Sequence, residues 1–103
     1  MDTSVMHHLE NELSRLWKRY GASPKQRDAW YWGFVIGIEI ESKKRGLSCK
    51  TNYFNYAEIM YPMLLKHKIY RFFIKKGFSM QEKRFFDKGL SDGKLVVSGL
   101  DSK

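Results

Sequence analysis

The chain of 103 residues is long enough for one domain around one core, and an apolar content of 43% excludes a compositionally disordered protein. Nineteen lysines and arginines against eleven aspartates and glutamates give a net charge of +8, which is typical of proteins that meet an acidic partner. The single cysteine, Cys49, excludes an intramolecular disulfide and a zinc site built on several thiolates, and it favours a reducing compartment, the cytoplasm.

The first predicted helix runs from Ser4, a candidate N-cap, to about Tyr20, and Gly21 supplies its stop. Its apolar residues recur at three- and four-residue spacings, which places them on one stripe of the helix. The stripe consists of Val5, Leu9, Leu13, Leu16, Trp17 and Tyr20.

The second predicted helix begins at Ser23, a capping serine followed by a proline and, three residues on, by Gln26. It extends to Arg45, and Gly46 ends it. Residues 29 to 38 are apolar on every side, so we expect this helix to be the central one, although the run is too short for a membrane span of about 20 residues. The alternating residues 36 to 41 also fit a strand, but the caps at both ends favour a helix.

The second half of the chain contains further start and stop signals. After a loop over residues 47 to 53, Asn55 with Glu58 opens a third helix, which Pro62 kinks or restarts. A helix over residues 63 to 76 follows and stops at Gly77. A capping box over residues 79 to 82 opens the last helix.

We expect the last helix to end near Leu90, because Gly89, Asp92 and Gly93 break it. Residues 94 to 97 then form a short edge strand or an extended segment, and residues 99 to 103 are frayed. The predicted fold class is all-α: a small single-domain bundle of four to five helices over residues 1 to 103, with or without a short C-terminal extended segment.

Positive charge concentrates between Lys43 and Lys76, where nine basic residues face one acid, Glu58. Lys68, Arg71 and Lys75 recur at three- and four-residue spacings and share one helix face, which suits backbone phosphates. Tyrosines interleave with these charges and offer rings on which unpaired bases stack. The alternative is a solvated face that only keeps the protein soluble, but such faces mix both signs. The predicted nucleic-acid contacts are Lys43, Lys44, Arg45, Lys66, Lys68, Arg71, Lys75 and Lys76.

Residues 69 to 90 are a second candidate for contact with nucleic acid, as a helix-turn-helix with its turn at residues 77 to 79. Two core positions depart from that motif, because Phe73 stands where a small residue is usual and Lys83 stands where an apolar one is usual. A plain helical hairpin is therefore favoured.

Gly33 and Gly37 lie one turn apart in the apolar helix, and their missing side chains would let another helix approach closely. Three consecutive aromatic residues, 30 to 32, point about 100° apart, so at least one lies on a surface. This pattern favours a partner-protein interface or a homodimer. The predicted protein-interface residues are Trp30, Tyr31, Trp32, Tyr53 and Tyr56.

Enzyme signatures are weak. Asp28 with Glu41 and Lys43 resembles the Asp…Glu-x-Lys pattern of a metal-dependent nuclease, but on one helix the two acids lie about 20 Å apart, too far for one metal ion. Residues 32 to 39, Trp-Gly-Phe-Val-Ile-Gly-Ile-Glu, resemble the glycine-rich interface helix of the LAGLIDADG homing endonucleases. In that family the glycines allow close helix contact and the acid that closes the motif binds metal; the resemblance covers this fragment alone, and no site is carried over from it.

The sequence therefore predicts a small, basic, non-catalytic protein that contacts nucleic-acid phosphates, of DNA or RNA, through residues 43 to 76, with no cofactor and no metal. The alternative is an adaptor or inhibitor, of the kind found in phages and mobile elements, that docks on an acidic or aromatic-binding protein surface. The third hypothesis is a small metal-dependent nuclease. We expect no membrane partner.

Overall fold

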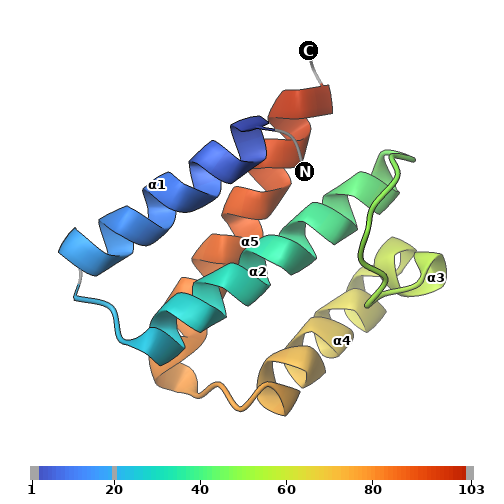
Figure 1. The fold of residues 1–103 in the computed structure, drawn as a ribbon. Coiled ribbons are helices and arrows are strands. Elements are labelled where there is room, and N and C mark those ends of the chain that lie inside the picture. Colours follow the sequence, from blue (N-terminus) through green and yellow to red (C-terminus); the bar gives the residue numbers. More distant parts are fainter. Residues whose placement is uncertain (1–2, 20, 102–103) are drawn as a thin grey trace.

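The computed structural model describes residues 3–19 and 21–101, and this part of the chain forms five helices (Figure 1). In chain order they are α1 (Thr3–Arg19), α2 (Pro24–Lys44), α3 (Tyr56–Met60), α4 (Pro62–Lys75) and α5 (Met80–Asp101). The described residues contain no strand, so the predicted all-α class is confirmed. In Figure 1, α2 runs through the middle of the bundle, with α1 on one side of it and α3 and α4 on the other.

Two predicted capping boxes mark the starts of α2 and α3. The Ser23 hydroxyl accepts the backbone N–H of Gln26 at 3.1 Å, and the Gln26 side-chain oxygen accepts the N–H of Ser23 at 2.9 Å. Asn55 and Glu58 form the same reciprocal pair, with both distances 2.9 Å. α2 continues without a break to Lys44, so residues 36 to 41 are helical and not a strand.

α1 covers one side of α2. It begins at Thr3, so the N-cap role predicted for Ser4 is wrong, because Ser4 lies inside the helix. Leu9 and Leu13 of the predicted stripe are half-buried and pack in a cluster with Trp30 and Phe34 of α2. The other stripe members, Val5, Leu16, Trp17 and Tyr20, have side chains outside the described part of the chain.

α2 and α5 cross so closely that their backbones touch. Gly33 and Gly37 of α2 lie against Phe86 and Leu90 of α5, and two glycines of α5 lie against α2 in turn. A Cβ at any of these four glycines would come closer than 3.0 Å to a backbone oxygen of the other helix, a distance that real Cβ atoms essentially never show. Successive contacts follow the same order along both helices, so α2 and α5 run in the same direction (Figure 1). The predicted packing role of the glycine pair in α2 is confirmed.

The predicted end of the last helix is wrong, because α5 runs to Asp101 and not to Leu90. Gly89 and Gly93 belong to the crossing with α2, and Asp92 is buried inside the bundle, so none of the three breaks the helix. The strand expected over residues 94 to 97 and the fraying expected from residue 99 are replaced by helix up to residue 101. Residues 102 and 103 lie outside the described part.

The side of α2 that faces away from α1 carries the larger core cluster. Ile36 and Ile40 are completely buried there, among side chains from the loop before α3 and from α3, α4 and α5. Phe73 of α4 packs against Phe86 of α5 with ring centroids 5.1 Å apart. This cluster holds α4 against the bundle by its inner face and leaves its outer face exposed.

Candidate nucleic-acid interface

The outer side of α4 carries a shallow hollow of about 540 Å³, which we call the basic hollow. It is lined among others by Tyr53, Glu58, Lys68, Tyr70, Arg71 and Lys75. The three cations are the ones that the sequence places on one helix face, and the structure brings them together. Arg71 and Lys75 are exposed, while the Lys68 side chain is 39% exposed.

Two tyrosines border the basic hollow and differ in how firmly they are held. The Tyr53 ring packs edge-on against Phe72 at 5.5 Å and against Trp32 at 6.0 Å, between ring centroids, yet Tyr53 remains 47% exposed. Tyr70 is 60% exposed on α4. The hollow therefore combines one aromatic ring in a fixed orientation, one more exposed ring and three cations.

Glu58 is the only acid among the described residues that line the basic hollow. Its carboxylate accepts the backbone N–H of Asn55 and pairs with Lys68 at 3.3 Å. The hydrogen bond from Asn55 is the main cause that lowers the pKa of Glu58 below its ordinary value of 4.5; desolvation opposes it, and the hydrogen bond and charge of Lys68 add to the lowering. Glu58 is thus ionised at neutral pH and partly neutralises Lys68, so Arg71 and Lys75 carry most of the available positive charge.

Lys43 does not contribute to the basic hollow, and its predicted role as a phosphate contact is wrong. Its ammonium group donates to the Asn52 side chain and to the carbonyl of Phe54, both at 2.5 Å, and lies 3.4 Å from Glu39. Only 15% of its side chain is exposed. Lys43 therefore stabilises the loop that leads from α2 to α3 through these hydrogen bonds.

Glu39 is the acidic counterpart of Lys43 and is completely buried. Its two carboxylate oxygens accept hydrogen bonds from the Thr51 hydroxyl at 2.6 Å and from the backbone N–H groups of Tyr53 and Phe54 at 2.9 and 2.7 Å. This network fixes the backbone of the segment that carries Tyr53, so it positions the Tyr53 ring beside the basic hollow. The acid that closes the LAGLIDADG-like fragment therefore has a structural function in this chain.

The remaining predicted cations are dispersed. Arg45 donates to Glu41 at 2.9 Å and to Ser98 at 3.1 Å, which ties the end of α2 to α5. Lys76 lies 3.9 Å above the Trp32 ring, in a cation–π contact. Lys44 and Lys66 line a different, apolar groove between α4 and α5. The eight predicted contacts thus do not form one surface.

The predicted aromatic interface is also only partly exposed. Trp30 is completely buried and donates from its indole nitrogen to Asp92 at 3.1 Å, so its assignment to an interface is wrong. Tyr31 is 38% exposed, which fulfils the expectation that one of the three consecutive aromatic residues lies on a surface, and Trp32 is half-buried. Tyr56 is 55% exposed.

Neither a helix-turn-helix nor the nuclease pattern finds support in the geometry. α5 is anchored on α2 along its length by Phe86, Gly89 and Gly93, and beyond the contact of Phe73 with Phe86 the groove separates α5 from α4. Asp28 and Glu41 lie near opposite ends of α2, and Glu41 is paired with Arg45. In the described part of the chain, no group of three or more histidine, cysteine or acidic side chains is arranged to hold a metal ion.

Sequence reasoning noted the tyrosines between the charges but did not assign Tyr70 to a site. Tyr70 directly precedes Arg71 on α4, and this position is the sequence signal for its place in the site. Both residues border the basic hollow because the loop that carries Tyr53 forms its other wall. The large apolar groove went unnoticed, since it depends on how α4 and α5 diverge.

No family model, no curated protein and no solved structure matches this chain. Among the described residues, no helix is both long enough and apolar enough to span a membrane. The fold is that of a small all-α bundle, and its function has to be inferred from its surfaces.

Proposed function

We propose that this protein binds single-stranded nucleic acid in the basic hollow. Arg71, Lys75 and Lys68 bind consecutive phosphates, and unpaired bases stack on Tyr53 and Tyr70. The proposal rests on one observation: three cations at one-turn spacing on α4 line the same hollow as two exposed tyrosine rings.

The combination of residues favours single strands over duplex. Phosphate contacts alone are indifferent to strandedness, but aromatic rings can stack only on bases that are not already stacked in a helix. In this hollow, the Tyr53 ring is held by Phe72 and Trp32, so it offers a stacking surface at little cost in side-chain entropy. The net charge of +8 attracts a polyanion over longer distances.

The expected salt dependence follows from the number of cations. Each phosphate neutralised on a single strand contributes about −0.7 to the slope of log K against log salt concentration, so three contacts predict a slope of about −2. Because Glu58 competes for Lys68 at 3.3 Å, the slope is expected to lie slightly below this value in magnitude.

The test compares two triple variants with equal loss of charge by fluorescence anisotropy on a labelled single-stranded oligonucleotide. The Lys68→Ala/Arg71→Ala/Lys75→Ala variant removes the cations of the basic hollow. The control, Lys18→Ala/Arg19→Ala/Arg84→Ala, removes three exposed cations from α1 and α5. We expect the first to lose most of the affinity and to flatten the salt slope, and the control to lose little.

Equal losses in both variants would show that net charge and not the hollow attracts the strand, and unchanged binding in the first would remove the proposal. Tyr70→Leu provides a separate check on stacking. It should weaken binding by about 1 kcal/mol or more and leave the salt slope unchanged.

A further inference from the structure

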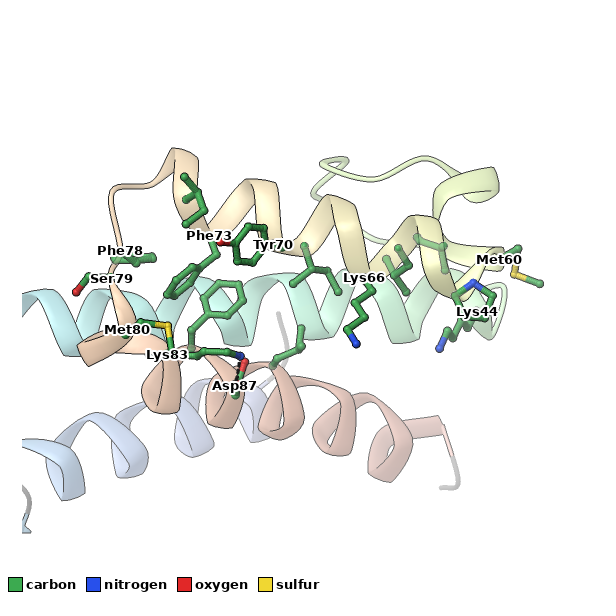
Figure 2. Close-up of a pocket in the computed structure, with 17 residues that line it drawn as sticks. Lys44, Met60, Lys66, Tyr70, Phe73, Phe78, Ser79, Met80, Lys83 and Asp87 are labelled. Atoms are coloured by element: carbon green, nitrogen blue, oxygen red, sulfur yellow. Dashed lines mark hydrogen bonds and ion pairs between the residues drawn. The ribbon is translucent and has the colours of Figure 1, made fainter.

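An apolar groove of about 1020 Å³ lies between α4 and α5 (Figure 2). Its inner wall is formed by buried or half-buried side chains, with Leu65, Ile69 and Phe73 from α4 and Phe86 and Leu90 from α5. This groove adjoins the basic hollow on the outer side of α4, and Tyr70 and Ile74 border both.

The groove exists because α5 and α4 are held by different contacts. The glycine crossing draws α5 onto α2, while α4 packs on α2 through Phe72 and Trp32, whose ring centroids are 5.9 Å apart. α4 and α5 touch at their connected ends, where Phe73 meets Phe86, and side chains from both helices line the space beyond (Figure 2). The groove is thus a consequence of how the helices pack in the core.

The edges of the groove are apolar and exposed. Met60 lies at one end and Met80 at the other in Figure 2, and they are 58% and 76% exposed. Tyr70 and Ile74 form part of the α4 edge and are 60% and 50% exposed. A contiguous exposed apolar patch of this kind marks an interaction site, and methionine adapts its shape to varied partners.

The charges around the groove are almost all positive. Lys44, Lys66 and Lys83 line it together with a single acid, Asp87 (Figure 2). Asp87 pairs with Lys83 at 2.9 Å, whereas among the described residues Lys44 and Lys66 have no ion-pair partner. The occupant that complements this surface is apolar along one side and acidic at its edges.

We infer that the groove docks an amphipathic helix of a partner protein, with apolar residues on one face and aspartates or glutamates flanking them. α4 has 14 residues, which corresponds to about 21 Å at 1.5 Å per residue, so a partner helix of similar length matches the groove. Such a helix inserts apolar anchors at positions i, i+3 or i+4, and i+7. A second copy of this chain is a poorer occupant, because two chains of +8 repel each other.

The inference is tested with a designed, fluorescein-labelled helical peptide of 14 residues, which carries leucines on one face and glutamates beside them. The control peptide has lysine in place of every glutamate. We expect the acidic peptide to bind and the basic peptide to bind at least about ten-fold more weakly, since several rim charges change from attraction to repulsion. Equal affinity for the two peptides, or no binding of the acidic one, would overturn the inference.

A charge-reversed protein makes the test specific to the groove. Lys66→Glu/Lys83→Glu changes two exposed side chains and should invert the preference between the two peptides. Met80→Asp places an acid in the first turn of α5, where the helix dipole favours it, so the fold is retained while acidic-peptide binding falls. Unchanged binding by both variants would place the peptide elsewhere and refute the groove.

Two further outcomes would also overturn the inference. Sedimentation of the intact protein as a dimer that Met80→Asp dissociates would assign the groove to a second copy. Displacement of the peptide by a single-stranded oligonucleotide, with loss of oligonucleotide binding in Met80→Asp, would assign it to nucleic acid. Met80, Lys66 and Lys83 do not line the basic hollow. Met80→Asp should therefore leave oligonucleotide binding within about two-fold of the parent protein. The double variant should weaken oligonucleotide binding only as far as its lower net charge does.

Discussion

The glycine crossing predicts opposite effects for two alanine substitutions in the same helix. In Gly89→Ala, the new Cβ would collide with the backbone oxygen of Trp30 and lie 2.9 Å from the backbone nitrogen of Phe34. Both obstacles are backbone atoms of α2 and cannot rotate away, so the helices must move apart. In Gly99→Ala, a Cβ meets nothing within 4 Å.

The magnitude follows from two opposing terms. Alanine in place of glycine inside a helix stabilises it by about 1 kcal/mol, and this gain applies at both positions, although less near the end of α5. Overpacking costs typically about 1–3 kcal/mol and more where neither side can relax, because the separation also loosens the packing of Trp30 and Phe86. Since the cost at Gly89 lies at or above the upper end of that range, we expect Gly89→Ala to lose about 2 kcal/mol or more of unfolding free energy and Gly99→Ala to gain up to about 1 kcal/mol.

The assay is urea unfolding followed by far-ultraviolet circular dichroism, with the midpoint and slope compared among the parent and both variants. A total stability of about 5–15 kcal/mol for a small domain makes the loss in Gly89→Ala large and easily measured. If Gly89→Ala were as stable as the parent, or if both variants shifted in the same direction, the close parallel crossing of α2 and α5 would be refuted.

Three other predictions concern buried polar groups and capping. Glu39→Ala leaves the Lys43 ammonium without its buried carboxylate and should lower the unfolding free energy by about 3 kcal/mol in the same urea assay; a change below about 1 kcal/mol would contradict the buried network. Trp30→Phe removes the donor to Asp92 and should cost about 1–2 kcal/mol, which thermal unfolding would detect. The capping carboxylates Glu58 and Glu82 have a lowered pKa, chiefly through their hydrogen bonds from Asn55 and Ser79. Their contribution to the unfolding free energy is therefore complete above the ordinary pKa of 4.5 and is lost as the pH falls through the lower folded-state pKa. In urea titrations across pH 3 to 6, Glu58→Gln/Glu82→Gln should reduce this loss of stability at acid pH, and a pH profile equal to that of the parent protein would contradict the prediction.

The starts of α2 and α3 were predictable because their signals are local. Ser23 and Asn55 cap within three residues of themselves, so nothing distant decides the outcome. The end of α5 was not predictable in this way. Glycines such as Gly89 and Gly93 often end a helix. Inside α5 they are retained because their lack of a side chain lets the backbone of α2 approach closely. Their four-residue spacing matches that of the glycines in α2, and this match is the signal that sequence reasoning overlooked.

The candidate site was predictable only where one helix carries it. Lys68, Arg71 and Lys75 share a face because helical periodicity dictates it, and the structure places all three in the basic hollow. Lys43 and Trp30 belong to the basic and aromatic patterns of the sequence, yet both side chains are engaged in hydrogen bonds within the fold. The partner of Lys43 on the loop lies 11 positions away, and the partner of Trp30 lies 62 positions away. Composition gives the amount of charge, whereas tertiary contacts decide which charges remain available.

The central claim is that the basic hollow binds single-stranded nucleic acid. Its most direct test measures binding of the intact protein to single- and double-stranded oligonucleotides of equal length by fluorescence anisotropy, over a series of salt concentrations. We expect tighter binding to the single strand, with a slope of about −2 in log K against log salt concentration. No binding at low salt, or equal binding to single strand and duplex, would contradict it.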